Sequence, residues 1–214
     1  MNCRSILNSR VVITLFLLFS ALYYFRGVVD CDSWLWMDFT KALPVAFLGI
    51  TTWFIGGNKC LPLALLLSAC GDIAGEHGAF LWQIGFFAVA HIAFILYFLR
   101  MAKIDRGRIL LVSLWAIAMV LFGVFIISHI GNDIIKIACS LYILIIGTMT
   151  ATTVLIESKY RWFYVAAALI FVFSDSCIAW NRFVERFDGA GLTIMTTYFT
   201  AQLIFAILYI KDKK

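Results

Sequence analysis

The chain has 214 residues, of which 64% are hydrophobic and only 14% are charged. Soluble domains are typically about 45–50% apolar and about 25% charged, so this composition excludes a soluble globular protein and indicates an integral membrane protein. The formal net charge of +5 does not imply a nucleic-acid partner, and we expect none, because basic residues commonly mark the cytoplasmic loops of membrane proteins.

The apolar segments predict an all-α, polytopic membrane bundle of eight transmembrane helices. A membrane-spanning helix needs about 20 predominantly apolar residues, and dividing the chain at charges and glycines gives eight such segments with short loops. The first is expected to remain as a membrane helix rather than act as a cleaved signal. With only two prolines, residues 1–214 are expected to form a single integral membrane domain. The expected helices are 7–25, 34–55, 60–77, 79–99, 108–128, 134–156, 162–180 and 191–210.

The distribution of basic residues predicts the orientation. Twelve of the 17 Lys and Arg residues fall on the side of the two chain ends. These are Arg4, Arg10, Lys59, Arg100, Lys103, Arg106, Arg108, Lys159, Arg161, Lys211, Lys213 and Lys214. By the positive-inside rule, both termini are therefore expected to be cytoplasmic.

A weak internal repeat suggests two parallel four-helix halves. The segment "AHIAFILYFLR" (90–100) aligns at a constant offset with "AQLIFAILYIK" (201–211), and "GDIA" (71–74) is similar to part of "SDSCIA" (174–179). Such repeats are common in membrane transporters. Chance similarity between apolar segments is the alternative explanation.

Two aspartates lie deep within expected membrane helices. Asp72 follows Lys59 by 13 residues and Asp175 follows Arg161 by 14. At about 1.5 Å per residue, both are roughly 20 Å from the cytoplasmic end of their helices. An ionisable group at such depth costs about 2.5–3.5 kcal/mol to insert and usually faces the interior of the bundle. We therefore expect Asp72 and Asp175 to face one shared cavity.

Two further polar residues are expected in the same layer. His91 and Gln202 each precede the basic end of an inward-running helix by nine residues, which places them roughly 13–14 Å from the cytoplasmic side. The alternative is a hydrogen-bonded cluster that only holds helices together. Polar residues nearer the outer ends are typical of interface anchors when taken singly. Together they are expected to line the mouth of a pocket and bind an anionic head group; they are Lys41, Tyr142, Asn181, Arg182 and Tyr198.

The aspartates indicate acid–base chemistry. Burial favours the neutral form of a carboxyl group, and a neighbouring carboxylate favours it further. A neutral acid beside an ionised partner is suited to hydrolysis through an oxocarbenium-like state. Neither G-x-S-x-G nor H-E-x-x-H occurs, and the chain has only three histidines. Asp72 and Asp175 are therefore the candidate catalytic residues, and no metal or organic cofactor is expected.

Two segments carry a family resemblance. "LSACGDIAGEHGAFLWQIGFFAVAHIAFILYF" (67–98) and "FVFSDSCIAWNRF" (171–183) followed by "YFTAQLI" (198–204) resemble the two signatures of the YhhN family, which includes the TMEM86 lysoplasmalogenases. The resemblance implies hydrolysis of the vinyl ether bond of a lysophospholipid, a lysoplasmalogen, to a fatty aldehyde and a glycerophosphodiester. It also implies that Asp72 and Asp175 are the essential acids.

Other functions remain open at this stage. They are a proton-coupled transporter of small amphiphiles that uses the same aspartates, a metal-dependent intramembrane amidase or lipase, and a non-catalytic scaffold or receptor. Short loops favour a bacterial inner membrane over the endoplasmic reticulum. The expected partners are the lysophospholipid substrate and membrane lipid, and the sequence does not indicate an oligomeric state.

Overall fold

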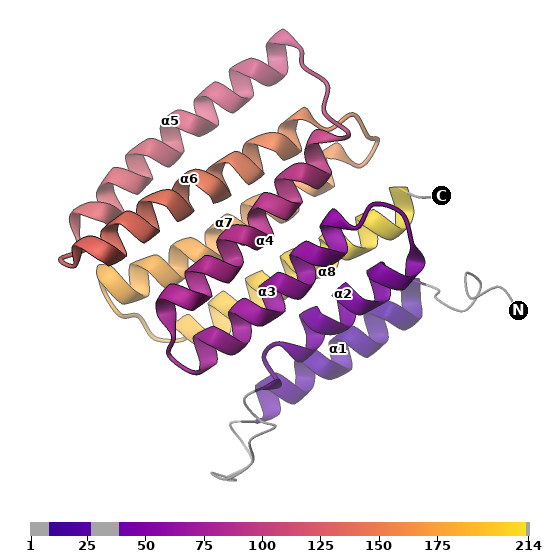
Figure 1. The fold of residues 1–214 in the computed structure, drawn as a ribbon, viewed down its shortest axis with the longest axis horizontal. Coiled ribbons are helices and arrows are strands. Elements are labelled where there is room, and N and C mark those ends of the chain that lie inside the picture. The colour runs from indigo at the N-terminus through magenta and orange to yellow at the C-terminus, as the bar shows by residue number, and fades with distance from the viewer. Residues whose placement is uncertain (1–8, 27–38, 213–214) are drawn as a thin grey trace, which may run out of the picture.

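The computed structural model describes residues 9–26 and 39–212, which form eight α-helices joined by short connections (Figure 1). Consecutive helices run in opposite directions, and α1 begins at the same end of the bundle at which α8 ends. The helices are α1 (Ser9–Phe25), α2 (Leu43–Ile55), α3 (Cys60–Glu76), α4 (Phe80–Leu99), α5 (Arg106–Ser128), α6 (Asp133–Leu155), α7 (Arg161–Phe183) and α8 (Ala190–Asp212).

Six of the eight helices form a closed, flattened ring. Helix α3 packs between α2 and α4, and α7 packs between α6 and α8. The ring is closed by contacts of α4 with α6 and of α2 with α8. Helix α1 lies against α2 and α8, whereas α5 lies at the opposite edge against α6 and α7. The interior of this ring holds the polar residues discussed below.

The helix boundaries agree with those expected to within three residues, except at the start of the second helix. Residues 7 and 8 of the first expected helix lie outside the described residues. Helix α2 begins at Leu43 rather than at residue 34; residues 34–38 lie outside the described part of the chain, and residues 39–42 form a turn. Pro44 lies in the first turn of α2. Proline suits that position because the first N–H groups of a helix have no intrahelical partner, whereas deeper in a helix it removes a hydrogen bond.

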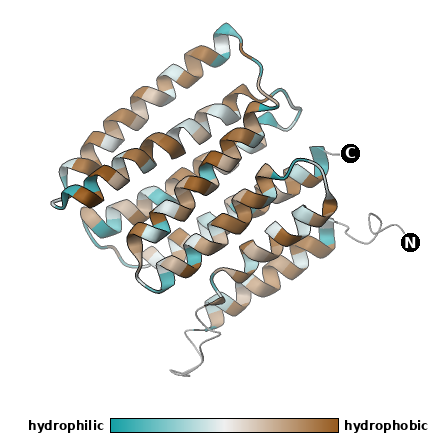
Figure 2. Cartoon of the chain, viewed as in Figure 1, coloured by the Kyte–Doolittle hydropathy of each residue, from teal (hydrophilic) through white to brown (hydrophobic). Residues whose placement is uncertain are grey.

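The apolar surface is that of a multi-pass membrane protein. Helices α4 to α8 are each long and apolar enough to cross a membrane, while α1 and α2 are shorter apolar helices. Figure 2 shows hydrophobic residues along the lengths of the helices and hydrophilic residues mainly at their ends. Large side chains on α5 face outward, including Leu110, Leu121 and Val124, which are more than 60% exposed. Such exposure is ordinary for a surface covered by lipid tails.

Aromatic side chains fill the interior nearest the chain ends. Phe205 on α8 packs against Phe94 and Phe98 on α4, with ring centroids 5.0 and 5.6 Å apart. Phe98 in turn contacts Tyr164 on α7 at 5.7 Å. All four side chains are fully buried. This half of the ring is therefore a packed core, and the space available for a ligand lies toward the other end.

Two glycines allow α3 and α4 to approach closely. A Cβ atom added at Gly71 would lie 2.8 Å from the Phe87 ring, and one at Gly75 would lie 2.6 Å from Nε2 of Gln83. Both distances are shorter than normal van der Waals contact, so a larger side chain at position 71 would push against the Phe87 ring, and one at position 75 would force the end of the Gln83 side chain to move. The glycine that precedes Asp72 thus has a packing role, which is to seat Phe87 beside α3.

Candidate active site

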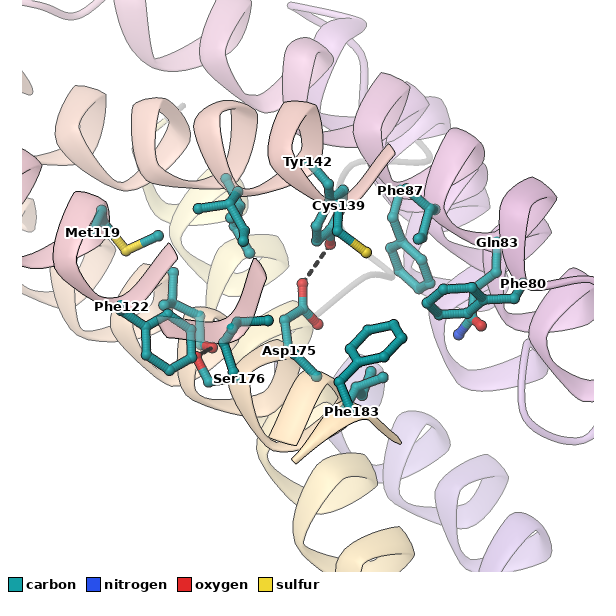
Figure 3. A pocket seen from close by; sticks show the side chains of 17 residues that line it. Phe80, Gln83, Phe87, Met119, Phe122, Cys139, Tyr142, Asp175, Ser176 and Phe183 are labelled. Carbon is teal, nitrogen blue, oxygen red and sulfur yellow. Dashed lines mark hydrogen bonds between the residues drawn. The ribbon is translucent and has the colours of Figure 1, made fainter. Parts of the chain in front are cut away.

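A mainly apolar cavity opens between α4, α5, α6 and α7 (Figure 3). The cavity has a volume of about 70 Å³ and is enclosed mainly by apolar side chains. Met119 and Phe122 lie on one side of Asp175, and Phe80 and Gln83 lie on the other. Among the residues that line this cavity, Asp175 supplies the carboxyl group. An apolar cavity with one acid is suited to a largely hydrophobic ligand with one reactive bond.

Asp175 belongs to a hydrogen-bonded cluster with Tyr142 and His91. The Tyr142 hydroxyl donates to Oδ2 of Asp175, as Figure 3 shows. Nε2 of His91 lies 2.9 Å from the same hydroxyl and 3.8 Å from Oδ2 of Asp175. Because the single hydroxyl proton of Tyr142 is directed to Asp175, Nε2 of His91 must carry a proton to donate to the hydroxyl oxygen. Three helices, α4, α6 and α7, thus meet at one tyrosine.

Asp72 lies in a second cluster with Tyr198. The Tyr198 hydroxyl donates to Oδ2 of Asp72 across 2.7 Å, and both residues are buried. Gln202 lies one turn further along α8 and is fully buried. Its amide lies close to the Tyr198 hydroxyl, although no hydrogen bond of normal geometry is formed to it within the described part of the chain. This cluster joins α3 to α8.

The two aspartates therefore occupy adjoining clusters rather than the walls of one shared cavity. Asp72 is not among the residues that line the cavity containing Asp175. Phe171 packs between the clusters, with its ring centroid 5.4 Å from that of Tyr198 and 4.8 Å from that of His91. The position of the two acids along their helices predicted that both lie inside the bundle. It could not predict that the Phe171 ring lies between their clusters.

Lys41 lies on the Asp72 side of the molecule. It is half-buried in the turn before α2 and, together with Glu76, is close enough to act electrostatically on Asp72. Glu76 also forms a salt bridge with Arg26 across 2.8 Å. Lys41 does not line the cavity beside Asp175, so its position differs from the expected pocket mouth.

Asn181 and Arg182 lie near the C-terminal end of α7, in the wall of a second cavity. The Arg182 guanidinium carbon is 3.8 Å from the centroid of the Phe80 ring, a cation–π contact. Oδ1 of Asn181 accepts a hydrogen bond from the backbone N–H of Phe187 across 3.2 Å. The second cavity shares lining residues with the first, including Phe80 and Gln83. The two cavities therefore adjoin.

The structure adds residues that sequence reasoning missed. Gln83 and Phe87 line the cavity, and their spacing of four residues from each other and from His91 is the signal that one helical face joins all three. Phe171 precedes Asp175 by four residues and shows the same signal on α7. No group of three His, Cys, Asp or Glu residues within residues 9–26 and 39–212 is arranged to hold a metal ion.

Comparisons with known proteins find relatives over most of the chain. A profile of the YhhN family matches residues 36–208. Lysoplasmalogenase TMEM86B of Sus scrofa is 31% identical over 195 residues, which cover 88% of this chain and 82% of that protein. TMEM86B of Rattus norvegicus is 29% identical over 201 residues, covering 90% and 81% of the two chains.

Bacterial relatives match as well. A lysoplasmalogenase of Mycobacterium bovis is 32% identical over 154 residues, which cover 69% of this chain and 59% of that protein. No solved structure matches the chain. Both aspartate clusters lie within the segment that the family profile covers. The chain belongs to the YhhN family.

Proposed function

We propose that the chain is a lysoplasmalogenase, which hydrolyses the vinyl ether bond of a lysophospholipid to a fatty aldehyde and a glycerophosphodiester. The observation that carries the proposal is the position of Asp175, which lines an apolar cavity and is bonded through Tyr142 to His91. The names of the relatives in mammals and mycobacteria support the same activity.

The proposed reaction begins with proton transfer to carbon. A neutral carboxyl group of Asp175 donates its proton to the β-carbon of the vinyl ether, and an oxocarbenium ion forms at the carbon bonded to oxygen. Water adds to that carbon and loses a proton to the carboxylate, which restores the acid. The resulting hemiacetal breaks its carbon–oxygen bond to give the aldehyde and the free glycerol hydroxyl. One water molecule is consumed, and no redox partner is needed.

Tyr142 and His91 position the acid in this scheme. Their hydrogen bonds fix Oδ2 of Asp175, which leaves Oδ1 as the oxygen directed at substrate and water. Groups held before the reaction stabilise developing charge without having to reorient. The apolar wall formed by Phe122 and Met119 excludes bulk water and receives the hydrocarbon chain.

Asp72 acts from the adjoining cluster. Its carboxylate, held by Tyr198, contributes negative charge behind the Phe171 ring that favours the oxocarbenium ion. This assigns different parts to the two acids, because Asp175 contacts the substrate and Asp72 acts through space.

We further propose that all eight helices cross the membrane with cytoplasmic termini, in a bacterial inner membrane. The even number of antiparallel helices, the basic residues near the chain ends and the positive-inside rule support this topology. Two related four-helix halves are supported by matching neighbours, since α4 packs on α6 as α8 packs on α2.

Asparagine variants test the catalytic assignment. Pure wild-type protein in detergent is expected to release aldehyde from a lysoplasmalogen, and Asp175→Asn is expected to lower the rate by about 100-fold or more. Asp72→Asn is expected to lower it too, with a smaller effect because that residue does not line the cavity. Asp188→Asn, at an exposed position in the α7–α8 loop, is the matched control. Wild-type turnover by Asp175→Asn would refute the mechanism, and absence of aldehyde from the wild type would refute the function.

A further inference from the structure

We propose that Arg182 and Arg186 form a binding site for the phosphodiester group of the substrate, at the outer mouth of the cavity. This inference rests on the proposed function and adds the position of the head group to it. Both arginines line the second cavity, together with Asn181 and Gln83. The ligand chemistry is a singly charged phosphodiester attached to an apolar chain.

The charges of the two arginines are available to a ligand. Within the described part of the chain, no salt bridge joins either guanidinium group to a carboxylate. Arg182 is held over Phe80 at 3.8 Å and lies 5.9 Å from the Phe183 ring centroid. Stacking of this kind fixes the plane of a guanidinium group and leaves its edge N–H groups free to donate. Two such groups suit the oxygen atoms of a phosphodiester, which arginine binds in a bidentate manner.

The two cavities form one path from the arginines to Asp175. Phe80, Gln83 and Phe183 line both cavities, and Figure 3 shows all three on the same side of Asp175. Met119 and Phe122 lie on the other side of the acid. A ligand that spans this path has its charged group beside the arginines and its hydrocarbon beside α5.

The spacing along α7 fits the length of the substrate. Arg182 follows Asp175 by seven residues, which is two turns on the same helix face and about 10 Å of rise. In a lysoplasmalogen, seven covalent bonds separate the phosphorus atom from the β-carbon of the vinyl ether. An extended chain covers about 3.3–3.6 Å in three bonds, so these seven bonds span about 8 Å. The flexible side chains of the arginine and the aspartate accommodate the difference.

Binding of stable ligands tests the site without relying on turnover. The probes are a 1-O-alkylglycerophosphoethanolamine, whose saturated ether cannot undergo this reaction, and the matching 1-O-alkylglycerol without phosphate. The double variant Arg182→Gln/Arg186→Gln is expected to bind the phosphate-containing probe about 10-fold or more weakly than wild type. Its affinity for the alkylglycerol should change by less than about 2-fold. Arg161→Gln, at the opposite end of α7, is the matched control and should leave both affinities unchanged.

The binding results test the arginine site separately from the proposed lysoplasmalogenase activity. Equal affinity of wild type and double variant for the phosphate probe, or equal losses for both probes, overturns the inference. Displacement of the probe by inorganic phosphate as effectively as by glycerophosphoethanolamine overturns its assignment to a lipid head group. If the double variant is unstable, Arg186→Gln alone tests the same point, because this side chain is exposed and its loss should still weaken only the phosphate probe. Failure of the proposed function is recognised separately, as an absence of aldehyde from wild-type protein.

Discussion

Replacing Tyr142 with phenylalanine removes one oxygen atom from the centre of the cluster formed by Asp175, Tyr142 and His91. The hydroxyl donates to Oδ2 of Asp175 and accepts from Nε2 of His91. The ring fills the same space in the variant, so the change isolates the two hydrogen bonds. His91 is fully buried, so its Nε2 loses its hydrogen-bond partner.

The expected magnitude follows from the bond to the acid. In the proposed reaction Asp175 becomes a carboxylate as it gives its proton to carbon, and a hydrogen bond to a charged group contributes about 1.5–3 kcal/mol. About 1.4 kcal/mol corresponds to a tenfold change in rate. Tyr142→Phe should therefore lower kcat for aldehyde release by about 10- to 160-fold. The effect on KM should be small, because the hydroxyl is directed at the acid and the histidine.

The assay is mass-spectrometric detection of aldehyde from a purified lysoplasmalogen, with thermal unfolding measured in parallel. Tyr97→Phe is the matched control, since Tyr97 is a buried tyrosine whose hydroxyl lies 3.4 Å from that of Tyr164 near the other end of the bundle. The control should retain wild-type turnover. If Tyr142→Phe also turns over at the wild-type rate, the positioning of Asp175 by this hydroxyl is refuted.

Two further predictions concern stability. Gly71→Ala places a Cβ atom 2.8 Å from the Phe87 ring and should lower the free energy of unfolding by about 1–3 kcal/mol through overpacking. Gly85→Ala is the control and should be neutral or stabilising, because the added atom meets nothing within 4 Å. Equal melting temperatures for the two variants would contradict this account. The hydrogen bond to Lys103 lowers the pKa of the exposed Glu157 in the folded protein. The ion pair therefore stabilises the fold at pH values above the ordinary pKa of glutamate. This stabilisation is lost as the pH falls through the lowered pKa of the folded state. Glu157→Gln should therefore give a small decrease in melting temperature at pH 7 that disappears in acid, and a decrease that grows in acid would be the opposite result.

Composition and segment length predicted the helices well, because the lipid requirement acts on each segment separately. The exception, the start of α2, depends on Pro44 and on a turn that apolar character alone does not distinguish from a helix. Depth along each helix was predictable for the same reason, since it depends only on the rise per residue.

The lateral arrangement was not predictable in this way. Tyr142 becomes the centre of the site because α4 packs on α6, and nothing in the sequence of either helix specifies that neighbour. Asp72 pairs with Tyr198 rather than with Asp175 for a similar reason, as α3 meets α8 across the ring. Contacts between helices depend on the shapes of whole faces, which spacing patterns describe only in part.

Helix α5 supplies Met119 and Phe122 to the cavity and lies at the edge of the bundle, where it packs mainly against α6. For a substrate seated as proposed, this helix would lie between the hydrocarbon and the surrounding bilayer. The reactive, water-insoluble aldehyde can then partition sideways into the membrane, while the water-soluble glycerophosphodiester departs past the arginines. Cleavage would thus send its two products into different phases, which disfavours their recombination and keeps the aldehyde away from amines in the aqueous compartment.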